Sequence, residues 1–233
     1  MCRLRKPYFA PLIPTNKLIH CFRGYWDAVT LKKFPTIENV FEFLPNSKPV
    51  RALSDVVSKT RALFATYDMM LNKPELGIDI VRWVVTRRAI QNEAMSIDDT
   101  GDCLFKTCRL AVQMFIAESI EPWAHLSLYH ENSSRALLLA IDECDRFNYW
   151  EAHPDVLLWA TIIGGYTARE NPIRWWYAEQ TRHSPIPLRE DCWTEVQKLS
   201  ENFLPFKYRQ GDGLQHFWNE ACSWISANKL PRV

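Results

Sequence analysis

Glycine is scarce in this sequence, with 7 in 233 residues, whereas tryptophan is frequent, with 10. A fold made of many tight β-turns uses glycine at positions with positive φ, so this scarcity disfavours a turn-rich β architecture. Hydrophobic residues make up 47% of the chain and occur in long stretches, which favours helices around a common core. We therefore predict an all-α fold, a multi-helix bundle of about eight to nine helices with an irregular, proline-rich N-terminal segment.

The sequence also lacks an excess of charge of either sign. Lysine and arginine together number 28 and aspartate and glutamate 27, which gives a formal net charge of +1. A domain that wraps nucleic acid usually carries a clear surplus of basic residues, because it neutralises phosphates. We predict no direct nucleic-acid contact.

No apolar run is long enough to span a bilayer, which takes about 20 residues. The N-terminus is basic, but Pro11 and Pro14 interrupt its apolar part, so it lacks the core of a secretory signal. We expect no membrane association and a location in the nucleus or cytoplasm.

Paired cysteines are missing as well. The seven cysteines are scattered and none forms C-x-x-C, so we expect reduced thiols packed as small hydrophobes. His125 and His130 lie five positions apart, the wrong spacing for one helix face, and no metal site is predicted. There is no P-loop, no G-x-G-x-x-G and no G-x-S-x-G, so we predict no cofactor and no serine nucleophile.

Prolines divide the chain into two parts. Residues 1–50 hold six prolines, which excludes long helices from most of this segment. We predict an irregular segment over residues 1–50, packed on a single helical domain over residues 51–233. The periodicity of apolar residues and the capping signals predict helices over residues 36–44, 51–72, 76–95, 103–119, 133–150, 188–200 and 212–227, and a helical hairpin within residues 153–183.

The stretch from His153 to His183 predicts a helical hairpin. Pro154 suits the first position of a helix that continues through an apolar run, so this arm should be buried nearly all round. Gly164 and Gly165 lie inside it, and each costs a helix roughly 1 kcal/mol relative to alanine. Close approach by a second helix would compensate this cost. Asn171 and Pro172 restart the chain as an N-cap and a first helical residue.

The same segment resembles the fungal-specific transcription factor domain, the helical regulatory region of fungal binuclear zinc-cluster factors. The resemblance rests on Pro154, Leu157, Leu158, Trp159, Gly164, Gly165, Ala168, Arg174 and Trp175. Residues 86–97 and 107–120 are similar to two earlier helices of that family, and Trp193, Leu199, residues 203–205 and residues 217–218 are similar to its C-terminal end. The similarity extends over residues 77–224.

The resemblance implies a role in transcriptional control through protein partners of the transcription machinery. It leaves room for a small hydrophobic effector and for a homodimer. The six cysteines of the family's zinc cluster are missing, so this chain is not expected to read DNA as the family does. It is interpreted as a fragment of a longer factor, a stand-alone relative, or a copy used for other work.

Large aromatic residues give the one candidate ligand pocket. Most of them should form the core, but some could line a cavity between helices, and the candidate residues are Trp159, Trp175, Tyr177, Arg109 and His153. Arg109 lies in an apolar helix and needs a partner, for which Asp142 or Glu143 is expected. Arg174, with Arg169 and Arg182, could meet an acidic partner or an anion, but a solvated face that bonds helix C-termini is the expectation.

Two functions follow from these features. The first is a regulatory domain without its own DNA-binding cluster, which the sequence favours over an enzyme. The alternative is a helical scaffold reused as a small-molecule enzyme of fungal secondary metabolism, such as a cyclase that guides its substrate by shape. An enclosed cavity lined by Trp159, Trp175 or Tyr177 together with a histidine would favour this alternative.

Overall fold

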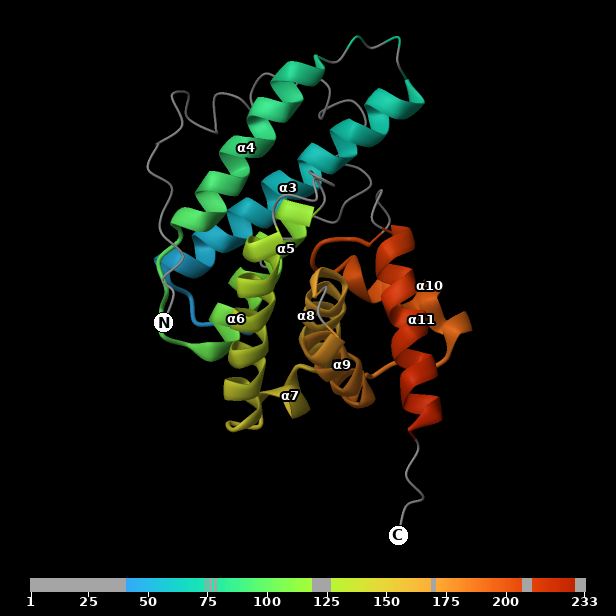
Figure 1. Ribbon diagram of the computed structural model, residues 1–233. Helices are drawn as coiled ribbons and strands as arrows, with labels where there is room; N and C mark the ends of the chain where they lie inside the picture. The colour runs from blue at the N-terminus through green and yellow to red at the C-terminus, as the bar shows by residue number, and fades with distance from the viewer. Residues whose placement is uncertain are drawn as a thin grey trace. The chain divides into compact units, whose positions relative to one another are not determined.

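The computed structural model describes residues 41–73, 75, 77, 79–118, 127–168, 171–206 and 211–228. Within these ranges the chain forms nine α-helices and no strand, so the predicted all-α class and helix number are confirmed (Figure 1). Two compact units make up the chain, residues 1–99 and residues 100–233. The sequence predicted one body over residues 51–233. The division falls in a polar stretch after the first two helices, because these two helices pack against each other.

The first unit contains a hairpin of α3 (Lys48–Asn72) and α4 (Ile80–Ser96). The helix α3 begins three residues earlier than predicted, because Ser47 accepts a hydrogen bond from the backbone N–H of Val50 (3.4 Å) and Pro49 fits the first turn. The helix α4 begins after Asp79, whose carboxylate accepts hydrogen bonds from the N–H groups of Val81 and Arg82. Trp83 joins the two helices by donating its indole N–H to the carbonyl of Leu63 (3.0 Å).

One face of each helix fills the interior of this unit. Leu53, Val56 and Val57 of α3 and Ile90 of α4 are buried, as the periodicity predicted. Leu71, Ile80 and Val84 share the apolar periodicity of these two helices, but they are exposed. The short helix predicted over residues 36–44 falls mostly outside the described residues, and residues 41–44 form a turn.

The second unit is an array of seven α-helices. They are α5 (Cys103–Glu118), α6 (Ser127–Asp145), α7 (Tyr149–Ala152), α8 (Pro154–Thr167), α9 (Asn171–Gln180), α10 (Trp193–Ser200) and α11 (Gly211–Ala227). Two 3₁₀ turns, Thr181–His183 and Glu190–Cys192, follow α9. Asp102 caps α5 by accepting a hydrogen bond from the N–H of Phe105 (2.7 Å).

The central element of this unit is α8, which contacts α5, α6, α9 and α11 (Figure 1). Eleven of its fourteen residues are buried, so the prediction of a helix buried nearly all round is confirmed. Nearly every side chain of α8 is apolar, which is typical of a helix with neighbours on all sides.

Three predicted boundaries in this unit were wrong. The helix α6 begins at Ser127, so Ser133 and Ser134 are buried inside it and do not cap it. It ends at Asp145, because Asn148 adopts a left-handed conformation (φ 56°), and Trp150 therefore belongs to α7. The helix α10 begins at Trp193, because prolines and a 3₁₀ turn occupy residues 185–192.

Candidate functional site

The five residues predicted to line a pocket lie on four segments of the second unit. Trp159 lies on α8, Trp175 and Tyr177 lie on α9, Arg109 lies on α5, and His153 joins α7 to α8. Trp159 and Tyr177 are fully buried, whereas the other three are partly exposed.

Tyr177 lies where α6, α8 and α9 meet. Its hydroxyl donates a hydrogen bond to the backbone carbonyl of Ser134 (2.7 Å), and Ser134 donates to the carbonyl of Gly164 (3.2 Å). Burial raises the pKa of the Tyr177 hydroxyl above its usual range, since the phenolate would lose its hydration. The hydroxyl therefore stays protonated and holds α9 on α6.

The paired glycines of α8 make this contact possible. A Cβ at Gly164 would lie closer than 3 Å to the ring of Tyr177, and one at Gly165 closer than 3 Å to the ring of Phe217 on α11. The prediction of a close helix approach is thus confirmed, with two neighbouring helices in place of one.

The tryptophans of the predicted pocket stack on other rings. Trp159 stacks on Phe203, with ring centroids 5.0 Å apart, and Trp175 stacks on Trp224 at 4.5 Å. The indole N–H of Trp159 is buried and has no hydrogen-bond partner among the described residues. Stacked rings of this kind fill the space between the helices, because the face of each ring packs against the face of the other.

Arg174 of α9 was expected on a solvated face, where it would bond a helix C-terminus or meet an acidic partner. It makes both of these contacts, but it is half-buried and joins three helices. It donates to the carbonyls of Gly165 (2.6 Å) and Ala168 (3.2 Å) at the C-terminal end of α8. It also binds Glu220 of α11 through two of its nitrogens. A guanidinium satisfies these last carbonyls of α8 and favours the negative end of the helix dipole.

Arg109 was expected to pair with Asp142 or Glu143, and His153 is the N-cap residue of α8. Arg109 is half-buried on α5, and the two acids expected beside it form ion pairs with other residues. Asp142 binds Arg146 (2.8 Å), and Glu143 lies 3.6 Å from Lys106. The carbonyl of His153 accepts the first hydrogen bond of α8, from Leu157 (3.2 Å).

Five cysteines lie within the described residues, and all are buried thiols. Burial raises the pKa of Cys108, Cys144, Cys192 and Cys222, with Cys222 at about 11. The thiolate is the nucleophilic form, so these thiols are poorly suited to attack a substrate at neutral pH. Their small apolar side chains serve packing, as the sequence predicted.

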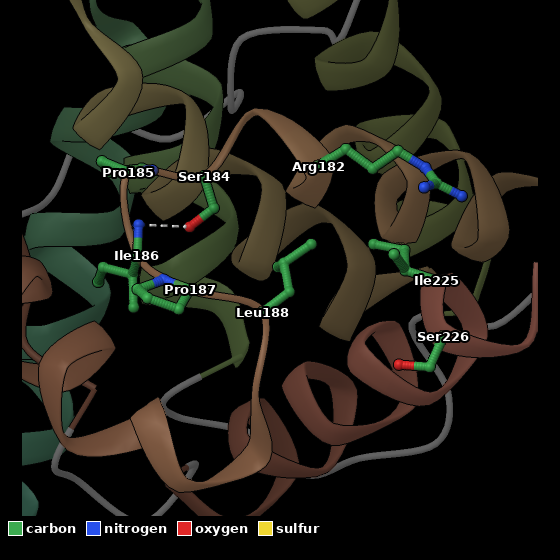
Figure 2. Close-up of a pocket in the computed structure, with 8 residues that line it drawn as sticks. All are labelled: Arg182, Ser184, Pro185, Ile186, Pro187, Leu188, Ile225 and Ser226. Atoms are coloured by element: carbon green, nitrogen blue, oxygen red, sulfur yellow. Dashed lines mark hydrogen bonds between the residues drawn. The ribbon is translucent and has the colours of Figure 1, made fainter. Parts of the chain in front are cut away.

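A hollow of about 400 Å³ lies between the loop that follows α9 and the C-terminal half of α11 (Figure 2). Its aliphatic lining comes from Pro185, Ile186, Pro187, Leu188 and Ile225, and its polar lining from Arg182, Ser184 and Ser226. None of the five predicted pocket residues lines it. We call it the loop hollow. Sequence reasoning missed it, although the alternation of prolines in S-P-I-P-L marks a fixed, irregular backbone.

Polar groups of the loop hollow are already engaged. Ser184 accepts a hydrogen bond from the N–H of Ile186 (3.0 Å), as the dashed line in Figure 2 shows. Arg182 forms an ion pair with Glu179 and donates to the carbonyl of Asn228. The surface that the hollow exposes is nevertheless more polar than apolar, so it gives no specific argument for an apolar ligand.

Four of the five exposed large apolar side chains described in the first unit lie on α4, and the fifth is Leu71 of α3. Ile80 is 51% exposed, Val81 66%, Val84 39% and Val85 43%. We call these four residues the α4 face. The opposite side of α4 carries Trp83, Ala89 and Ile90, which are buried. The sequence signal for this second apolar side was the motif I-V-x-x-V-V. Together with the buried residues, its aliphatic residues cover more of the helix surface than a single contact with α3 needs.

No family model, no curated protein and no solved structure matches the chain. In the part that the structure describes, no group of three histidine, cysteine, aspartate or glutamate residues is placed to hold a metal ion. None of the helices described has the length and apolar character that a bilayer crossing needs.

Proposed function

We propose that this chain is a regulatory, all-helical domain of the transcription-factor type that acts through protein contacts in the nucleus or cytoplasm. The observation that carries this proposal is the α4 face, where four aliphatic side chains lie exposed on two consecutive turns. Clustered apolar surface of this kind marks protein interaction sites, because association removes it from water.

The regulatory part of the proposal is supported by the resemblance to the fungal-specific transcription factor domain. Four of its matching residues have clear packing roles: Pro154 begins α8, Gly164 and Gly165 admit two neighbouring helices, and Arg174 joins α8 to α11. A shared pattern at such positions fits a shared helical scaffold.

The enzymatic alternative has less support. It requires a cavity among Trp159, Trp175 and Tyr177, whose rings instead stack on Phe203 and Trp224 and pack against Gly164. A cyclase holds its substrate in a cavity of matching shape. Rings that already contact one another leave little open cavity for a substrate.

A tethering experiment tests the proposal. The full chain is fused to an unrelated DNA-binding domain and its effect on a reporter gene is measured in yeast. We expect the fusion to change transcription, and the double substitution Val81→Ser, Val85→Ser to reduce that change by at least about fivefold, because it removes apolar contact area. The matched control is Leu139→Ser, Phe147→Ser, which replaces two exposed apolar residues of the second unit.

Two results would overturn the proposal. One is a fusion that leaves transcription unchanged although it is expressed and folded. The other is tight, sequence-specific DNA binding by the purified chain alone, because the chain would then recognise DNA directly and would not act through protein contacts.

A further inference from the structure

Ser184 is the only serine or threonine in this sequence that is followed by a proline. A serine in this context is a substrate for proline-directed kinases, whose peptide groove accepts a proline directly after the phosphorylated residue. Proline suits that position because its ring fixes φ at about −65° and it has no backbone N–H that needs a partner. The sequence therefore offers one place to a kinase of this class, in the loop that follows α9.

The backbone at Ser184 is already extended. Its φ of −61° and ψ of 136° come directly after the 3₁₀ turn Thr181–His183, and Pro185 and Pro187 keep the next residues out of a helix. Both prolines are exposed, and Ser184 is half-buried. Kinases bind the residues around the phosphorylated serine in an extended conformation, so this loop needs little rearrangement.

Few backbone hydrogen bonds hold this loop in place. Among the described residues, the backbone of residues 185–188 forms one backbone–backbone bond, in which Pro187 accepts from the N–H of Arg189 (2.9 Å). The N–H of Ile186 donates to the hydroxyl oxygen of Ser184 (3.0 Å), which Figure 2 shows as a dashed line. Both bonds lie within the loop. The loop can therefore move into an enzyme groove without breaking a backbone bond to a helix.

The hydroxyl of Ser184 is available to accept a phosphoryl group. Hydroxyls on the helices, such as those of Thr60 and Thr167, donate to a carbonyl one turn earlier (both 2.7 Å). The hydroxyl of Ser184 accepts a hydrogen bond instead, and the described residues give its O–H no acceptor. A kinase can therefore remove this proton without first breaking a bond that the fold uses.

Arg182 precedes Ser184 by two positions and lines the same loop hollow, so it is the cation placed to hold a phosphate. Its guanidinium points away from Ser184 (Figure 2) and forms an ion pair with Glu179 and a hydrogen bond to the carbonyl of Asn228 (3.5 Å). Both contacts are exposed, and exposed ion pairs contribute little to stability. A phosphate carries about −1.5 to −2 charges near neutral pH, so it should outcompete the single charge of Glu179.

The surroundings of Ser184 also tolerate the added charge. The surface of the loop hollow is more polar than apolar, so a phosphate beside it stays hydrated. Ser184 follows the C-terminal end of α9 and its 3₁₀ turn, where a helix dipole disfavours a negative group. Arg182 and His183, the basic residues of that turn, oppose this effect.

From these observations we propose that Ser184 is a phosphorylation site for a proline-directed serine/threonine kinase, and that Arg182 holds the phosphate once it is attached. The Oγ of Ser184 attacks the γ-phosphorus of ATP, the bond from that phosphorus to the β–γ bridging oxygen breaks, ADP leaves, and the hydroxyl proton passes to a base of the kinase. The site shares no residue with the α4 face, and its phosphorylation is measured without a transcriptional readout, so the two proposals can fail separately.

Phosphorylation of the purified full-length chain tests the first part. The chain is incubated with ATP and, in separate assays, a mitogen-activated or a cyclin-dependent protein kinase, and tandem mass spectrometry locates the phosphorylated residue. We expect phosphate on Ser184 with at least one of these kinases. Ser184→Ala should abolish this uptake, and Pro185→Ala should slow it at least about tenfold, because the kinase loses the residue that it selects.

Ser226→Ala is the matched control. Ser226 is exposed and lines the same hollow, but it is followed by Ala227. Its substitution should leave the rate of uptake within about twofold of that of the wild-type chain. Circular dichroism keeps the comparison to folded variants.

The position of the attached phosphate gives a second test. A guanidinium beside a phosphate favours the dianion and so lowers the second pKa of the group, which is about 6 in phosphoserine. In the phosphorylated chain, Arg182→Gln should raise this pKa, as a titration followed by phosphorus NMR measures. Arg189→Gln replaces another exposed arginine of this loop, which pairs with Asp191, and should leave the phosphate pKa unchanged.

A chain that takes up no phosphate on Ser184 would overturn the proposed phosphorylation site. Equal rates of uptake by Pro185→Ala and the wild-type chain would also overturn it, because the proline would then not be recognised. A phosphate pKa that Arg182→Gln leaves unchanged would overturn the role of Arg182.

Discussion

At the scale of single residues, Gly164 and Gly165 decide how closely the second unit can pack. The sequence predicted a close helix contact here from the cost of two glycines inside an apolar helix. It could not identify the rings of Tyr177 and Phe217, because they follow 13 and 52 positions later and reach the glycines only through the arrangement of α8, α9 and α11. Local rules indicate that a contact exists, and the long-range fold determines its partner.

Alanine at either glycine tests this role. Helix propensity alone would stabilise the protein by about 1 kcal/mol, whereas a Cβ forced against a buried ring costs about 1–3 kcal/mol or more. We expect Gly164→Ala and Gly165→Ala each to lower the free energy of unfolding by about 2 kcal/mol in urea titrations.

A second substitution separates the clash from other effects. Phe217→Leu removes ring atoms near Gly165, so Gly165→Ala should cost less in that background than in the wild-type chain. A gain in stability from either alanine substitution would show that the rings move away without cost.

At the scale of helices, Lys59 connects α3 to α4. Its ammonium group lies 2.6 Å from Asp55 one turn earlier and 2.6 Å from Glu93 on α4, and its side chain is only 10% exposed. Burial by itself lowers the pKa of Lys59, but the hydrogen bonds and charges of the two carboxylates outweigh it and raise the pKa above the usual 10.5.

This contact should weaken in alkali. The pKa of Lys59 is higher in the folded chain than in the unfolded one, so its stabilisation is complete below pH 10.5 and is lost as the pH rises through the folded value. We expect Lys59→Met to cost about 1–2 kcal/mol at pH 7, and the difference from wild type to shrink above pH 10.5. Thermal unfolding of both proteins from pH 7 to 12 measures it, and a difference that stays constant would contradict this account.

Helix ends were predicted less well than helix interiors, and the reasons are local. The predicted start of α3 at residue 51 left out Pro49, yet proline fits the first turn of a helix, where no N–H donor is needed. The predicted start of α6 at residue 133 would place Ser133 and Ser134 at its N-terminal cap, yet Ser134 donates a hydrogen bond to the adjacent α8. The pattern of apolar residues indicated that α4 was a helix, but the aliphatic residues on both sides of it left open which side met the core.

At the scale of the whole chain, two compact units replace the single helical body predicted over residues 51–233. The polar stretch S-I-D-D-T-G-D separates the helices predicted over residues 76–95 and 103–119. It ends the first unit as well, since α3 and α4 bury their apolar sides against each other. The candidate pocket of five residues remains a prediction, whereas the loop hollow and the α4 face came into view only with the fold.

Limited proteolysis should cut between the two units. Residues 98–101 are all exposed, and Gly101 has a positive φ of 78°, which breaks regular backbone structure. A protease specific for acidic residues should cleave first after Asp98 or Asp99, as mass spectrometry of the fragments would show. Asp145, exposed at the end of α6, serves as the internal comparison, and earlier cleavage there would contradict the assignment.

The glycine pair of α8 also restricts the order in which this sequence can evolve. A larger residue at position 164 or 165 is tolerated only after position 177 or 217 has become smaller, whereas the reverse order passes through an overcrowded intermediate. Descendants of this chain should therefore carry small residues at 164 and 165 for as long as they keep both aromatic rings.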